Sequence, residues 1–163
     1  MNKALFILLL APILCSGQNF SVCLGVSANR LEQVGFTGNA SVIVRKYSAL
    51  KVEVSRFPSD SIDHFKFDIT ESSWNFNTEF LHHFLKESFA APYVIGGIGL
   101  TSLRREIYDP VDEILVKQKL TKMGLIYGLG VEFGFHIFKP YSEIKLQTAT
   151  QSWVIFFGCK VMI

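Results

Sequence analysis

Apolar residues alternate with small, polar or charged residues along most of the chain after its first 18 residues. The pattern is clearest between Leu125 and Ile163, where three successive stretches place apolar side chains on one face and glycine, glutamate or lysine on the other. A period of two is that of a β-strand, because successive side chains point to opposite faces of a sheet. The chain is therefore predicted to be all-β.

Eight segments carry this alternation and predict eight strands, at about residues 20–27, 40–45, 50–55, 74–85, 92–100, 127–135, 141–146 and 153–161. The connections near Ser48, Ser88 and Lys139 are short, whereas the intervening connections at 28–38, 58–73 and 103–123 are long and polar. Short turns at one end and long loops at the other are typical of an antiparallel up-and-down barrel that crosses a membrane.

Two of the long polar segments allow more than one interpretation. Residues 64–68 keep a strand-like alternation and could extend a hairpin above the barrel. Residues 112–122 could form a short helix or extend the sixth strand, and periodicity does not decide between these structures.

The N-terminus is typical of a secretory signal. Lys3 precedes an apolar run at residues 4–14, and Cys15, Ser16 and Gly17 supply small residues before the expected cleavage. The run is too short to cross a bilayer of about 30 Å as a helix. We therefore expect residues 1–17 to be a signal peptide and residues 18–163 to form one β-barrel domain.

Composition agrees with a barrel in a membrane. The chain is 49% hydrophobic, yet no stretch after the signal approaches the roughly 18 uninterrupted apolar residues of a spanning helix. A closed barrel satisfies its backbone hydrogen bonds between strands and shows lipid only every second side chain. The formal net charge of +2 is spread along the chain without a basic run, so nucleic acid is not expected as a partner.

The predicted inward face carries charges of both signs. A barrel of about eight strands is just wide enough for side chains to fill, so these groups would lie close together. Equal numbers of cations and anions favour a buried ion-pair network, and an ion or proton path is the functional alternative. The predicted network comprises Arg45, Lys51, Lys145 and Lys160 with Glu53, Glu79, Glu132 and Glu143.

The two cysteines after the signal are predicted to stay unpaired. Alternation places Cys23 inward and Cys159 outward, on the first and last strands. A disulfide would require the two Cβ atoms to approach each other, and opposite faces prevent that.

The segments PYVIGGIGL, YGLGVEFGF, PYSEIKL and WVIFFGCKVMI resemble the last four strands of small outer-membrane β-barrel proteins of the OmpA/OmpX-like type, often called porin-family proteins. The resemblance implies a closed eight-stranded antiparallel transmembrane barrel in the outer membrane of a Gram-negative bacterium, with outer-membrane lipids around it and a monomeric state. One departure is Ile163, because such barrels commonly end in Phe or Tyr.

The residues do not predict catalysis, a metal or a cofactor. His82 and His83 are adjacent and so point to opposite faces, while His64 and His136 fall in a loop and a turn. No two histidines have the spacing of a metal site. The glycines at 96, 97 and 99 lack the following helix that a phosphate-binding loop requires.

Three functions remain open at this point. The first is a structural or surface-contact barrel with an apolar outer belt that includes Trp74, Tyr127 and Trp153. Its loops, with Phe65, Phe67 and Tyr108 as candidate contacts, would meet an extracellular protein or glycan or simply be solvated. The second is a secreted lipocalin-like barrel that binds an apolar ligand inside. The third is a lipid A-modifying barrel enzyme, which needs a serine, a histidine and an acid at one rim.

Overall fold

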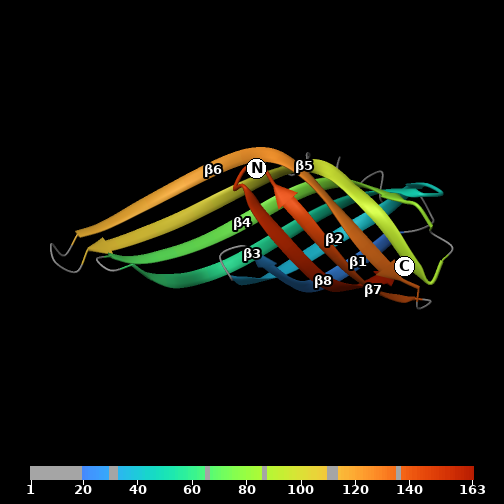
Figure 1. The fold of residues 1–163 in the computed structure, drawn as a ribbon, viewed down its shortest axis with the longest axis horizontal. Coiled ribbons are helices and arrows are strands. Elements are labelled where there is room, and N and C mark those ends of the chain that lie inside the picture. Colours follow the sequence, from blue (N-terminus) through green and yellow to red (C-terminus); the bar gives the residue numbers. More distant parts are fainter. Residues whose placement is uncertain (1–19, 30–32, 65–66, 86–87, 110–113, 135–136) are drawn as a thin grey trace.

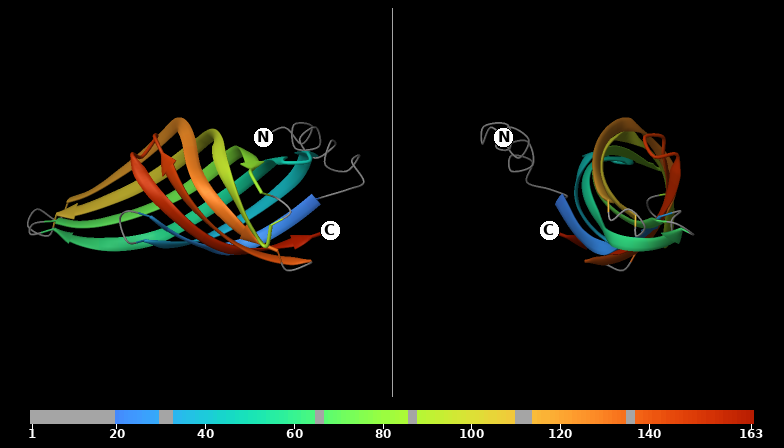
Figure 2. Two further views of the ribbon diagram at one scale, coloured as in Figure 1. Left: turned by 45° about the vertical axis from the view of Figure 1, so that its right-hand side comes forward. Right: turned by 90° about the vertical axis from the view of Figure 1, so that its left-hand side faces the viewer.

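The computed structural model describes residues 20–29, 33–64, 67–85, 88–109, 114–134 and 137–163. Across these residues, eight strands follow one another in chain order, each antiparallel to the next, and β8 pairs back with β1 to close a barrel (Figure 1). The right-hand view of Figure 2 shows the ring of strands from one end. The all-β, eight-stranded antiparallel barrel predicted from the alternation is confirmed. The predicted signal peptide, residues 1–17, lies outside the described residues.

The strands differ greatly in length. The four middle strands have 17 to 20 residues each, whereas the outer four have 10 to 12. No helix within the described residues is long and apolar enough to cross a membrane. The strands are β1 (Phe20–Asn29), β2 (Val34–Arg45), β3 (Ser48–His64), β4 (Phe67–His83), β5 (Ala90–Asp109), β6 (Ile114–Phe133), β7 (Phe138–Gln147) and β8 (Ser152–Met162).

The long strands continue past the closed barrel as a separate sheet. β2 pairs with β3 only as far as Arg56, and β7 pairs with β6 only from Ile126 to Glu132. Beyond these limits β3, β4, β5 and β6 pair only with one another, and Figure 1 shows them projecting together from one end. We call residues 57–64, 67–73, 103–109 and 114–120 the extension. The end of the barrel that carries it is the extended end, and the opposite end, where β1 begins and β8 finishes, is the terminal end.

The predicted loops at 28–38, 58–73 and 103–123 are therefore largely wrong. β2 already begins at Val34, the β3–β4 hairpin is paired as far as His64 and Phe67, and the β5–β6 pair continues to Asp109 and Ile114. The charged residues in these segments favour a loop by composition, but backbone pairing between long neighbouring strands outweighs side-chain polarity. Within the described residues, the alternative interpretations of an extended hairpin near residues 64–68 and a longer sixth strand near residues 112–122 match the structure, because His64 pairs with Phe67 and β6 begins at Ile114.

The barrel is apolar outside and polar inside. The outward side chains Leu24, Phe36 and Phe157 are 76%, 73% and 63% exposed, while Lys51 and Lys145 are buried. A soluble protein has the opposite distribution, since lysine and glutamate are rarely buried. The orientation predicted from the alternation is thus present in the structure. The predicted belt residues Trp74, Tyr127 and Trp153 all lie on the exposed side.

Glycines on the inner wall make room for two large rings. A Cβ atom at Gly130 would collide with the ring of Tyr93, and one at Gly158 would lie 2.5 Å from Cζ of Phe156. The Tyr93 ring thus lies over Gly130 of the neighbouring strand β6, and the Phe156 ring lies over Gly158 of its own strand and over Gly25 of β1. This packing places the Tyr93 hydroxyl in the middle of the lumen.

Candidate functional site

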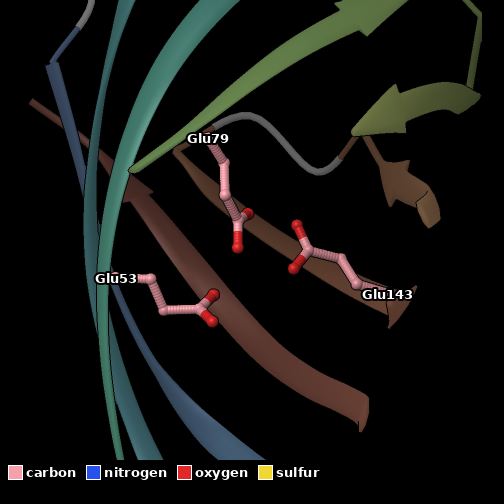
Figure 3. Close-up of side chains that lie close together, drawn as sticks. All are labelled: Glu53, Glu79 and Glu143. Atoms are coloured by element: carbon pink, nitrogen blue, oxygen red, sulfur yellow. The ribbon is translucent and has the colours of Figure 1, made fainter. Parts of the chain in front are cut away.

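A cluster of five charged side chains lies in the middle of the barrel. Lys51 and Glu53 come from β3, Glu79 from β4, and Glu143 and Lys145 from β7. Each is at most 2% exposed. Figure 3 shows the three carboxylates pointing toward one another from their separate strands. Alternation along each strand aims these residues inward, and barrel closure brings β7 opposite β3 and β4. We call these five residues the central cluster.

Both lysines contact all three glutamates. Lys51 Nζ lies 2.7 Å from each carboxylate oxygen of Glu143, 2.7 Å from Glu79 Oε2 and 3.3 Å from Glu53 Oε2. Lys145 Nζ contacts Glu53 Oε1 and lies 3.0 Å from Glu79 Oε1 and 3.3 Å from Glu143 Oε2. Each charge is therefore surrounded by opposite charges, which offsets the cost of removing it from water.

Two neutral groups complete the central cluster. The Asn77 side-chain amide donates a hydrogen bond to Glu53 Oε1 at 3.1 Å. The Tyr93 hydroxyl donates to Glu143 Oε1 at 2.9 Å. These donors matter because three carboxylates face only two ammonium groups, and hydrogen bonds to a carboxylate stabilise its negative charge.

The three carboxylates also have the spacing of a metal site. Oxygens of Glu53, Glu79 and Glu143 lie within 4.8 Å of one another, and carboxylate oxygens are the ligands that hard divalent cations prefer. However, both lysine ammonium groups contact every one of these carboxylates and lie between them. The arrangement is thus an ion-pair cluster whose cations are supplied by the chain itself.

A second group of charges lies nearer the terminal end. Glu132 accepts a hydrogen bond from Lys160, lies 3.2 Å from Lys139 Nζ, and has His83 Nε2 at 3.8 Å. Lys160 Nζ also lies 5.5 Å from the ring centre of Tyr141. The Tyr141 hydroxyl donates to Cys23 Sγ at 2.9 Å. It accepts from the Asn39 amide at 2.6 Å. Polar pairing therefore continues from the central cluster toward this end.

The structure buries seven of the eight predicted network residues and separates them into two groups. Five form the central cluster, and Glu132 pairs with Lys160 apart from it. Arg45 is a correction, because its side chain is exposed at the end of β2. The register between β2 and β3 shifts between Ile43 and Arg45, so strict alternation no longer aims Arg45 inward.

Of the three predicted loop contacts, two lie on the extension and one lies outside the described residues. Tyr108 is 39% exposed on β5. Phe67 begins β4, although the structure describes only its backbone, and Phe65 lies outside the described residues. The expected loop is thus replaced by a paired hairpin at this point.

Some contacts were missed by sequence reasoning. The sequence predicts a turn near Lys139 and no partner for His83, whereas both side chains contact Glu132 in the structure. On the outer wall at the terminal end, Ser48 Oγ lies 3.1 Å from His82 Nδ1. Within the described residues the structure records no acid bound to His82, so this pair lacks the third member of a catalytic triad. The two residues are register partners across β3 and β4, a pairing that period-two patterns do not reveal.

The described cysteines are as predicted. Cys23 is buried, Cys159 is exposed, and both are free. Their opposite faces follow from alternation along β1 and β8.

A cavity of about 460 Å³ lies at the extended end, where the barrel opens beneath the extension. Its wall contains an ion pair between Arg105 and Glu71, with Arg105 Nη2 and Nε 2.8 and 3.0 Å from Glu71 Oε2. Gln33 closes one side by donating from its amide to the Glu71 backbone carbonyl at 3.1 Å. The interior therefore changes from charged side chains at mid-height to a polar hollow at this end.

Comparison with known proteins gave matches in structure only. No protein-family model matches the sequence, and no curated protein matches it either.

Among solved structures, the N-terminal β-barrel domain of OprF from Pseudomonas aeruginosa is similar with a TM-score of 0.71 and 11% identity, over 90% of this chain and 98% of that one. The outer membrane protein OprG of Pseudomonas aeruginosa gives 0.68 and 10%, over 90% and 96%. Ail, the attachment invasion locus protein of Yersinia pestis, gives 0.63 and 12%, over 90% and 99%. The chain therefore has the fold of the small outer-membrane β-barrels, as its sequence resemblance implied.

Proposed function

We propose that this chain is a small integral outer-membrane β-barrel of a Gram-negative bacterium that acts as a structural and surface-contact protein, without catalysis. The observation that carries the proposal is the inverted distribution of side chains. Large apolar residues cover the outer wall, while lysines and glutamates are buried inside. Only a solvent of acyl chains makes such an outer wall favourable, because water would penalise its exposed apolar area.

The interior supports a structural rather than a conducting role. Both lysines of the central cluster contact all three of its glutamates, and these residues are at most 2% exposed. A conducting path needs sites that bind an ion weakly enough to release it. Lysines and glutamates that contact one another across the lumen instead tie opposite walls together and fill the middle of the barrel.

The extended end is proposed to face the cell exterior. Just beyond the apolar belt, the outward face of β3, β5 and β6 carries basic side chains that would meet the anionic headgroups of the outer leaflet. Arg56 lies 5.1 Å from the ring centre of the belt residue Trp74, and Arg104 pairs in register with Lys119. The terminal end would then lie in the periplasm, which is usual for barrels with short turns there.

A surface-contact role is supported by the extension and by one of the structural neighbours. The extension lifts exposed side chains such as Tyr108 beyond the membrane, where they can meet a protein or glycan. The similar protein Ail is an attachment protein by its name and has been crystallised with the heparin analogue sucrose octasulfate. We extend to this chain only the general role of an external contact surface.

The two alternatives require features that differ from those observed. A lipocalin-like barrel needs an apolar interior and a polar exterior. A lipid A-modifying enzyme needs a serine, histidine and acid together at the outer rim, whereas the Ser48–His82 contact lies at the terminal end.

The proposal is tested by expressing the full chain in a Gram-negative host, followed by membrane fractionation and gel electrophoresis with and without boiling. We expect the protein in the outer-membrane fraction, with different mobility before and after boiling. N-terminal sequencing should show that the mature chain begins at Gln18. Recovery as a soluble periplasmic protein would contradict the proposal.

A further inference from the structure

The cavity at the extended end has walls that suit a polar ligand. Its volume of about 460 Å³ is within the range of small-molecule sites. Its described lining is unusually rich in carboxamides, which are those of Asn29, Gln33, Asn75, Gln147 and Gln151. Ser73, Thr101, Thr150 and Ser152 add hydroxyl groups.

These groups match a ligand that carries several hydroxyls. A carboxamide offers both a donor and an acceptor, and so does each hydroxyl of a sugar, so neighbouring pairs can be satisfied together. Apolar lining from Phe57, Leu103 and Leu120 offers a surface for the C–H faces of a sugar ring. Some of the polar groups are already held in place, since the Asn29 amide donates to Gln33 Oε1 at 3.0 Å.

One buried acceptor in the wall lacks a partner. Asn75 is 3% exposed, and its Oδ1 atom has no hydrogen-bond partner within the described residues. A buried amide oxygen without a donor is costly, and such groups in native structures usually have a reason. A ligand hydroxyl in the cavity would supply the missing donor.

The net positive charge of the described cavity wall favours a sugar that carries a negative charge. Glu71 and Arg105 neutralise each other, which leaves Lys122 as the additional charge among the described lining residues. The structure records no ion pair for Lys122 within the part of the chain that it describes. Lys122 is the register partner of Thr101, which also lines the cavity, so both lie on the same face of the sheet.

We propose that this cavity binds a sugar ring that bears a carboxylate, with the sugar hydroxyls on Asn75 and the neighbouring carboxamides and the sugar carboxylate on Lys122. The inference deepens the proposed surface role, on which it rests for access to external glycans.

The test is a titration of the purified full-length barrel in detergent with glucuronate and with glucose, followed by NMR of the cavity amides. These sugars differ by a carboxylate in place of a hydroxymethyl group. We expect saturable shifts with glucuronate at millimolar concentrations, and at least about fivefold weaker binding of glucose. Ketodeoxyoctonate and N-acetylneuraminate are then compared, because the first is typical of lipopolysaccharide and the second of host glycans.

Two variants and one matched control decide the assignment. Lys122→Met should remove the preference for glucuronate, whereas Lys119→Met, which removes the same charge from the opposite face of β6, should keep it. Asn75→Leu should weaken both sugars about tenfold or more.

The proposal is overturned if neither sugar shifts the cavity amides, if glucose binds as well as glucuronate, or if both lysine variants behave alike. Mobility before and after boiling is measured on the same preparations. A barrel that is heat-modifiable but binds no sugar would overturn this inference and leave the proposed function standing.

Discussion

The extension is built from four of the eight strands of the closed barrel, yet its side chains are distributed differently from those of the barrel wall. In the closed part of β4 and β5, outward residues such as Phe76, Phe80 and Ile98 are apolar and exposed, and inward Glu79 is buried. In the extension of the same two strands, outward Arg104 and Glu106 form an ion pair at 2.7 Å. Strand pairing therefore continues where apolar and polar residues no longer alternate. The apolar belt, in contrast, ends where contact with lipid is proposed to end.

The two regions also differ at their edges. The barrel has no free edge, because every strand pairs on both sides. Along the whole extension and as far as Leu125, β6 has no neighbouring strand on its β7 side within the described residues. Leu125 itself exchanges hydrogen bonds with Thr148. Lys117 and Lys119 on this edge strand are charges of the kind that discourage edge-to-edge association.

The largest expected effect comes from breaking the central cluster. Lys51→Met leaves three buried carboxylates with one ammonium group, so we expect a loss of about 3–5 kcal/mol in the free energy of unfolding. Urea unfolding in lipid vesicles measures it. The matched change in the extension is Arg105→Met, which removes a half-exposed partner of Glu71 and should cost about 1 kcal/mol or less. Equal losses in the free energy of unfolding for the two variants would show that the ion pairs of the central cluster and of the extension contribute alike to stability.

A charge on the outer wall should distinguish the two regions next. Ile98→Arg places a guanidinium in the belt and should cost about 2–4 kcal/mol in a bilayer. Leu115→Arg makes the same kind of change on the extension, where Leu115 is 50% exposed, and should alter stability by no more than about 0.5 kcal/mol. The readout is again urea unfolding in vesicles. A similar cost at both positions would place the extension within the bilayer.

Glycine packing offers a smaller and purely local test. Gly130→Ala would push against the Tyr93 ring and should cost about 1–3 kcal/mol. Gly96→Ala serves as the control, because nothing lies within 4 Å of a Cβ atom there. Thermal unfolding in detergent compares the two variants. If Gly96→Ala proved the more harmful, the placement of Tyr93 over Gly130 would be wrong.

Shortening the extension should have the smallest effect on the barrel. Residues 61–70 and 107–116 are each replaced by Asn-Gly, which joins the register partners Asp60 with Glu71 and Glu106 with Lys117. Because the closed barrel keeps all its pairing, we expect heat-modifiable mobility to persist and stability to change by about 1 kcal/mol or less. Loss of the folded band would mean that the extension is needed for the barrel to form. Loss of cell-surface contacts with the barrel intact is expected if the extension carries them.

The sequence predicted the barrel wall better than its ends. The side of the wall on which Val52 and Glu53 lie can be predicted from residue type alone. An apolar side chain is favoured against lipid and a polar one in the lumen, and these two environments alternate at successive positions of a strand. In the extension both faces carry charged residues, so the pattern at 104–122 resembled that of a loop, although β5 and β6 remain paired as far as Asp109 and Ile114. Arg45 was misplaced for a related reason, since one shift of register reverses the side on which the following residue lies.

The chain by itself determined the strand count, the antiparallel order and which side chains face inward, because these follow from local alternation and turn spacing. Tertiary structure decided which inward residues meet. Glu143 and Lys145 reach Lys51 and Glu79 only because closure sets β7 across the lumen from β3 and β4. The separation of Glu132 and Lys160 from that cluster, and the cavity beneath the extension, likewise depend on the tilt and unequal length of paired strands, which no single segment of sequence encodes.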